Sequence, residues 1–226
     1  MAHTGSEGLV PSPVAPAPAK PLLRGVSHEV AAFAALAAWI VLALAAPGGR
    51  GRAAANVYGA SLFTLFLVSA LYHRPNWAPR ARLLMKRLDH SAIFLLIAGT
   101  YTPLCLILPP SSGLPLLAIV WGGAALGILR SIFWVRAPKP LVAALYVALG
   151  WAAFPILPAL GATLGTAALV LLGAGGAAYT VGAVVYATRR PDPFPRVFGY
   201  HEVFHALVIA AAACHFAVVV RAIAGL

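Results

Sequence analysis

Residues 54–73 read AANVYGASLFTLFLVSALYH, and no acidic or basic side chain precedes the final histidine. A helix rises about 1.5 Å per residue, so a segment of this length crosses the roughly 30 Å hydrocarbon core of a bilayer. The segment therefore predicts a membrane-spanning helix. Ser69 and His73 lie one helical turn apart at its end, which places both side chains on one face.

Similar segments make up most of the chain. Hydrophobic residues account for 62% of the 226 positions and charged residues for 9%, with a mean hydropathy of +0.90, which is too apolar for a soluble domain. Six further apolar segments follow the same pattern: 28–46, 88–108, 114–133, 141–157, 161–187 and 199–220. The sequence predicts an all-α integral membrane protein, a bundle of seven transmembrane helices over residues 23–226.

The prediction is bounded by an amino-terminal tail, and its weakest boundary is the turn between the fifth and sixth segments. Residues 1–22 alternate proline with small residues, which predicts a disordered tail. This tail lacks the basic start and apolar run of a secretory signal. The turn between the fifth and sixth segments has only Pro155 and Pro158 as breakers and no charge. If both prolines lay inside one longer kinked span, the count would fall to six.

Basic residues predict the orientation. Short cytoplasmic loops carry the excess of lysine and arginine. One side of the predicted membrane holds Lys20, Arg24, Arg74, Arg80, Arg82, Lys86, Arg87, Arg130, Arg136, Lys139, Arg189, Arg190 and Arg196, and the other holds Arg50, Arg52 and Arg221. The amino terminus is therefore expected in the cytoplasm and the carboxyl terminus outside. The net charge of +11 then reflects topology and contact with anionic lipid, not a nucleic-acid partner.

The polar residues converge at the predicted cytoplasmic side. His201 and His205 lie on one helical face, and Ser69, His73 and Asp89 reach the same depth from two other spans. A single histidine or aspartate at a helix end is typical of a wet interface, where polar groups cost little. Three histidines at one depth instead favour a metal site.

Three neutral imidazoles with one open position are typical of catalytic zinc. Zinc lowers the pKa of its bound water and polarises a carbonyl oxygen. Asp89 is the candidate to accept a proton from that water, and Ser69 the candidate to hydrogen-bond the water or the oxyanion.

These motifs resemble the hemolysin III proteins, the bacterial branch of the progestin and adiponectin receptor family, which is related more distantly to alkaline ceramidases. The motifs are Ser69-x-x-x-His73, Leu88-Asp89-His90-Ser91, Ala98-Gly99-Thr100-Tyr101-Thr102-Pro103 and His201-x-x-x-His205. The resemblance implies a multi-pass protein of the bacterial inner (cytoplasmic) membrane with its amino terminus inside. It also implies Zn²⁺ held by His73, His201 and His205, with Asp89 and Ser69 beside the metal-bound water. In relatives the site is associated with hydrolysis of lipid amides. The name of the bacterial branch records a haemolytic phenotype, and some of its members are linked to membrane lipid homeostasis.

Other polar residues leave alternatives open. His28 is expected at the interface, with a place beside the metal ligands as the alternative. His90 lies about 100° around the helix from Asp89, and His215 is too far along its helix to share the metal. Glu202 completes the pattern His-Glu-x-x-His, in which glutamate is the general base of a metalloprotease. An intramembrane protease is the less favoured interpretation. In the favoured one, Glu202 is an interfacial or supporting residue.

Two classes of function remain. The first is a zinc-dependent hydrolase of a lipid amide or ester, whose acyl-chain substrate enters sideways between helices. The second is a non-catalytic sensor, regulator or pore with structural zinc. A fourth protein ligand such as His28 or His90 would favour the second class. Membrane lipids are the expected partners, and no protein partner can be inferred from the sequence.

Overall fold

The computed structural model describes residues 20–226, so the expected tail over 1–22 lies almost wholly outside the described residues. Within that part the regular secondary structure is helical, apart from one isolated bridge between Phe194 and Phe198. The elements in order are α1 (Val26–Ala45), α2 (Arg50–His73), α3 (Pro79–Leu106), α4 (Pro110–Phe133), α5 (Lys139–Gly150), the 3₁₀ helix η1 (Trp151–Ile156), α6 (Leu157–Leu164), α7 (Thr166–Thr188) and α8 (Tyr200–Ala224).

Six helical segments of the described chain are long and apolar enough to cross a membrane. They are Val26–Ala45, Arg50–His73, Pro110–Phe133, Lys139–Leu164, Thr166–Thr188 and Tyr200–Ala224. Large apolar side chains such as Phe33, Leu44 and Leu126 point outward from these helices, as expected where lipid replaces water. The protein is therefore a multi-pass membrane protein.

The prediction of a turn near Pro155 and Pro158 is wrong. Residues Lys139–Leu164 form one continuous span of 26 residues, in which α5, η1 and α6 follow without a loop. Pro155 lies in the 3₁₀ segment and Pro158 in the first turn of α6, where a missing backbone N–H breaks no helical hydrogen bond. The chain reverses instead at Gly165, whose φ of +83° suits glycine.

Helix α3 is the longest at 28 residues and is not one of these six segments. Its first half carries several charged residues, and its second half carries Thr100, Tyr101 and Thr102. Many of its residues are buried between neighbouring helices, because α3 packs against α2 and α4 and also contacts α5 and α8. The seventh membrane crossing, which α3 would supply, stays a prediction, as does the orientation of the termini.

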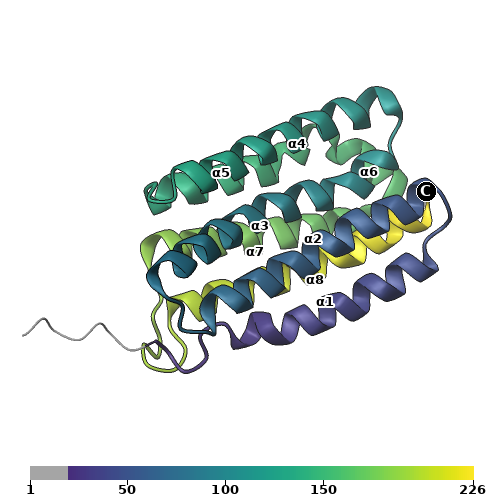
Figure 1. Cartoon of the computed structure of the whole chain (residues 1–226). Coiled ribbons are helices and arrows are strands. Elements are labelled where there is room, and N and C mark those ends of the chain that lie inside the picture. Colours follow the sequence, from purple (N-terminus) through teal and green to yellow (C-terminus); the bar gives the residue numbers. More distant parts are fainter. Residues whose placement is uncertain (1–19) are drawn as a thin grey trace, which may run out of the picture.

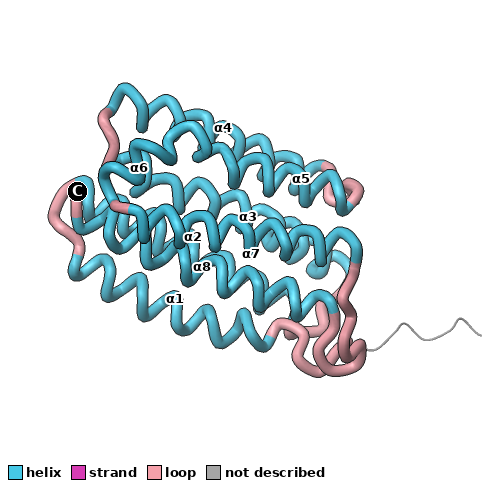
Figure 2. The backbone as a smooth tube through the Cα atoms, turned by 180° about the vertical axis from the view of Figure 1, so that it is seen from behind, coloured by secondary structure: helices cyan, strands magenta, loops and turns pink. Residues whose placement is uncertain are grey.

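The long helices run side by side in a bundle (Figures 1 and 2). We call the end where α2 finishes and α8 begins the histidine end, because His73, His201 and His205 lie there. The amino ends of α1, α3 and α5 lie at this end too, while the carboxyl terminus and the α1–α2 loop lie at the opposite end (Figure 1). Pairs α1·α2, α2·α3, α3·α4 and α7·α8 make the most extensive contacts.

Candidate metal centre

The last turn of α2 and the first turns of α8 bring three histidines together. One ring nitrogen from each of His73, His201 and His205 lies within 4.8 Å of the others, and all three residues are buried. The Nε2 atoms of His73 and His201 are 3.0 Å apart. The expected convergence of these three residues is confirmed, although 128 positions separate His73 from His201.

The donor set suits a zinc ion. Two facing imidazole nitrogens satisfy each other only if one carries a proton, and the third ring adds another nitrogen to the same small volume. The Nδ1 atom of His205 is buried and has no hydrogen-bond partner among the described residues. A cation held by three imidazoles would satisfy nitrogens that the protein alone leaves competing.

The start of α8 is fixed by hydrogen bonds at its amino end. The Gly199 N–H donates to Oε2 of Glu202 at 2.8 Å, and the Tyr200 N–H donates to Oδ1 of Asp192 at 2.8 Å. These carboxylates satisfy donors that the first helical turn leaves free. They therefore set the position from which His201 and His205 project.

Glu202 has a structural environment. Its side chain is 2% exposed, and Oε1 accepts a hydrogen bond from Nε of Arg24 at 2.5 Å within an ion pair. Oε2 accepts from Gly199, so both oxygens have partners. Glu202 is absent from the walls of the cavity that His201 and His205 line. This geometry favours a supporting role over that of a protease base.

The end of α2 is held by residues that precede α1. Nζ of Lys20 donates to the His73 carbonyl at 3.3 Å and to the Pro75 carbonyl at 2.9 Å. Partial burial, followed by the positive charges of Arg82 and Arg24, lowers the pKa of Lys20. Gly25 passes so close that a Cβ added there would lie 2.8 Å from Cβ of His73.

His28 lies inside the site and not at the interface, so the favoured expectation for it is wrong. Only 3% of the residue is exposed. Its ring stacks on that of His205, with centroids 3.7 Å apart and planes at 4°, and its Nδ1 atom is 2.9 Å from Oγ of Ser69. Depth along the first span pointed to the site, but helix rotation was not readable from the sequence.

Ser69 and Asp89 lie together on the same side. Ser69 is buried one turn before His73, and Asp89 lies next to it and lines the same cavity. His90, the following residue, is buried but is not one of the clustered ligands. Its carbonyl accepts a hydrogen bond from Tyr146 at 3.2 Å. The described chain thus offers three clustered nitrogen ligands, with a hydroxyl and a carboxylate beside them.

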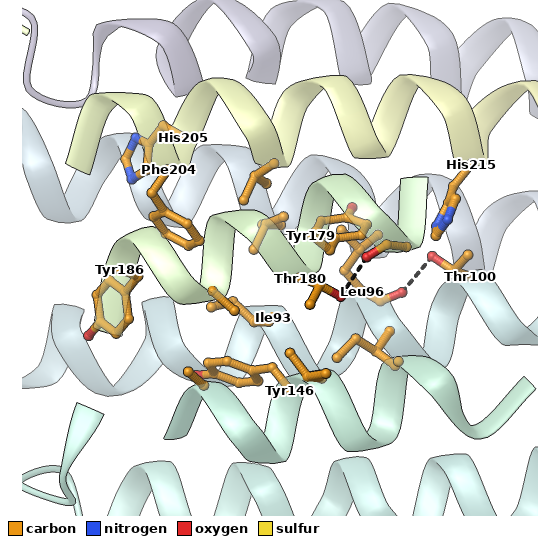
Figure 3. A pocket seen from close by; sticks show the side chains of 18 of the residues that line it. Ile93, Leu96, Thr100, Tyr146, Tyr179, Thr180, Tyr186, Phe204, His205 and His215 are labelled. Carbon is orange, nitrogen blue, oxygen red and sulfur yellow. Dashed lines mark hydrogen bonds between the residues drawn. The ribbon is translucent and has the colours of Figure 1, made fainter. Parts of the chain in front are cut away.

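A cavity of 520 Å³ extends from the histidines between the helices. His205, Phe204 and Tyr186 lie toward one end, and His215 and Thr100 toward the other (Figure 3). Ile93, Leu96, Leu104, Leu169 and Leu172 are among the apolar residues that line it. His215 contacts Tyr179 and lies near the Leu172 carbonyl, away from the cluster as expected. The cavity thus has a polar end and a long apolar part.

Comparison with known proteins assigns the family. Residues 17–216 match the family described as haemolysin-III related. The chain belongs to the hemolysin III family. Hemolysin-3 of Bacillus cereus is 36% identical over 200 residues, which cover 86% of this chain and 88% of that protein. The hemolysin-3 homolog of Bacillus subtilis (strain 168) is 31% identical over 162 residues, which cover 71% and 73%. The hemolysin III match includes every residue of the metal centre.

Proposed function

We propose that this hemolysin III protein is a zinc-dependent hydrolase of lipid amide or ester bonds. The observation that carries the proposal is the joint position of three clustered imidazoles, Ser69 and Asp89 at the polar end of an elongated apolar cavity. A lipid is the substrate whose shape matches that combination, because its acyl chain is apolar and its amide or ester is polar.

Each residue of the site has a separate role in the proposed reaction. A zinc ion held by His73, His201 and His205 would supply Lewis acidity and an activated water. Asp89 accepts a proton from the attacking water and returns it to the leaving group. Ser69 donates a hydrogen bond to the carbonyl oxygen as negative charge develops on it. His28 orients that hydroxyl through its 2.9 Å contact.

The substrate enters from the side. Trp151 and Phe154 of η1 line the cavity and are 41% and 69% exposed on the outer surface of the bundle. The cavity therefore reaches the lipid-facing surface at the kinked span. An acyl chain that enters there lies along the apolar walls, while its carbonyl group reaches the histidine end. We place that end on the cytoplasmic side of the bacterial inner membrane, where basic residues gather.

Zinc analysis and lipid profiling test the proposal together. Purified protein should hold about one zinc per chain. The double variant His201→Ala/His205→Ala should lose the zinc. The variant His215→Ala, which removes a histidine of the same cavity outside the cluster, should keep it. Asp89→Ala should keep both zinc and fold. Lipid profiles of cells producing Asp89→Ala should match those of cells without the protein and differ from those of cells producing the wild type. Profiles identical in all three strains would contradict the hydrolase.

Haemolysis is the second candidate function, and its support is the name of the relatives, hemolysin-3. A lytic activity without hydrolysis would make the zinc structural, and it would persist in Asp89→Ala. Lysis of red cells by wild-type and Asp89→Ala proteins, compared at equal amounts in the membrane, separates the two functions.

A further inference from the structure

Cations without carboxylate partners surround the polar end of the cavity. Lys86 of α3 and Lys139 at the start of α5 line its wall. Arg130, in the last turn of α4, lies within electrostatic range of Lys86 and of His90. These three residues, which we call the cation cluster, come from three helices. Lys86 and Lys139 line the cavity, and Arg130 is buried near Lys86 but is not one of the lining residues.

Aromatic residues connect Lys139 to the metal ligands. Its Nζ atom is 4.6 Å from the ring centroid of Tyr186, 5.4 Å from that of Tyr200 and 3.4 Å from the Tyr200 hydroxyl. The ring of Tyr186 is in turn 6.1 Å from that of His201, centroid to centroid. Cation–π contacts hold an ammonium group in place without neutralising its charge. Lys139 therefore holds its ammonium group close to the proposed reaction site.

None of the acidic residues of the described chain forms an ion pair with the cation cluster. Glu202 pairs with Arg24, and Glu29 pairs with Arg74. Asp192 accepts a hydrogen bond from the Tyr200 N–H, and Asp89 lies beside Ser69. Within residues 20–226, no ion pair therefore neutralises the cation cluster.

Arg130 gives a second, independent indication. Its Nε and both Nη atoms are buried, the Tyr146 hydroxyl lies near them, and no carboxylate of the described residues pairs with them. A buried guanidinium without a carboxylate partner is costly, so such groups are normally paired with an anion. The excess of cations at cytoplasmic ends explains why basic residues lie at this end, but not why they line a cavity or bury their nitrogens.

We propose that Lys86 and Lys139, with the positive charge of the nearby Arg130 behind them, bind the anionic part of the headgroup, a phosphate or carboxylate, of the lipid whose acyl chain occupies the cavity. The inference rests on the proposed function for the presence of a lipid in the cavity. It adds that this lipid carries a negative charge. Charge-assisted hydrogen bonds from lysine are a usual means of holding phosphate oxygens, and the charge of the nearby Arg130 adds to the attraction. The proposed substrate is an anionic lipid, whose bond to be cleaved lies at the metal centre.

Binding measurements on the full chain test this proposal without measuring hydrolysis. The protein in neutral detergent is titrated with dioctanoyl phosphatidylglycerol, dioctanoyl phosphatidylcholine or inorganic phosphate, and bound species are counted by native mass spectrometry. Phosphatidylglycerol should bind about tenfold more tightly than phosphatidylcholine, because its charge is uncompensated. The double variant Lys86→Gln/Lys139→Gln should lose that preference. The matched variant Arg80→Gln/Arg196→Gln removes two exposed cations from the same end and should keep it.

The other outcomes have distinct meanings. Equal binding of the two lipids, or a preference that survives Lys86→Gln/Lys139→Gln, overturns the proposal. Binding of phosphate without a preference between the lipids overturns the headgroup assignment in favour of a free anion. If His201→Ala/His205→Ala removes the preference instead, the anion sits on the metal and the cation cluster is not its site. A preference that persists in that zinc-free variant supports the proposal, whatever becomes of the hydrolase.

Each variant must first elute as a single species and keep its helical circular dichroism. The salt dependence of the wild type adds a measurement that does not depend on substitution. Phosphatidylglycerol binding should weaken as salt rises, because ions screen the attraction, while phosphatidylcholine binding should not. Equal salt dependence of the two lipids would count against the cation cluster.

Discussion

His28 contacts two residues on which the proposed chemistry depends, but it is not one of the three clustered ligands. Its ring lies parallel to that of His205, so it restricts the rotation of that ligand. Its Nδ1 atom also meets the Ser69 hydroxyl. We therefore expect His28 to position catalytic groups and not to hold the metal.

Replacing His28 by alanine separates these roles. The Ser69 hydroxyl would lose a buried hydrogen bond, worth about 1 kcal/mol, which corresponds to a loss of roughly fivefold in kcat. Zinc content should stay near that of the wild type. Metal analysis and hydrolysis of the lipid identified by profiling check both expectations. Loss of the zinc would mean that His28 is itself a ligand.

Glu202 is expected to support the fold. In Glu202→Gln the amide keeps an oxygen for the Gly199 N–H, but Arg24 loses its negative partner. The free energy of unfolding should fall by about 1–3 kcal/mol, the cost of leaving a charged group poorly paired. Thermal unfolding in detergent measures this change. Hydrolysis per folded molecule should remain, and a fully folded but inactive Glu202→Gln protein would revive the protease interpretation.

At the scale of elements, the start of α1 is packed against the end of α2. Gly25 has a φ of +81° and lies next to His73 and Arg74. An ion pair of 2.7 Å between Arg74 and Glu29 holds the same two helices together. These contacts bring His28 of α1 over the ligands of α2 and α8, so the geometry of the metal centre depends on a helix that supplies no ligand.

Gly25→Ala should disturb both the helix pair and the metal centre. The new Cβ would lie 2.8 Å from that of His73, and the left-handed backbone conformation disfavours a side chain. We expect a loss of about 1–3 kcal/mol in stability and weaker zinc binding. Gly48→Ala, where no atom lies within 4 Å of the added Cβ, is the matched control. Equal melting temperatures and zinc affinities in the two variants would contradict the role of Gly25.

The apolar pattern was sufficient to predict most helices. Segments such as 54–73 are long, uncharged and bounded by breakers, and their length alone implies helices that span a bilayer. The pattern failed at Pro155 and Pro158, because a proline ends a helix only where its missing N–H and its ring cannot be accommodated. A 3₁₀ segment and a first-turn position accommodate these two, which local sequence does not reveal.

For the whole molecule, the orientation in the membrane is the main untested prediction. Single cysteines replace Asn76, before α3, and Ser112, after it, in a background without Cys105 and Cys214. If α3 crosses the membrane with the histidine end in the cytoplasm, a membrane-impermeant thiol reagent should label residue 112 in intact cells. Residue 76 should react only after lysis. Labelling of both positions in intact cells would show that α3 does not cross.

The sequence by itself determined that this is a multi-pass helical membrane protein with two histidines spaced to share one metal ion, because hydropathy and the spacing of His201 and His205 are local properties. The tertiary structure alone decided that His28 faces the clustered histidines, that Glu202 pairs with Arg24, and that Lys86 and Lys139 line one cavity with Arg130 close to Lys86. Such relations depend on how each helix is rotated about its axis and packed. Side chains from distant parts of the chain set that rotation together, and no single segment encodes it.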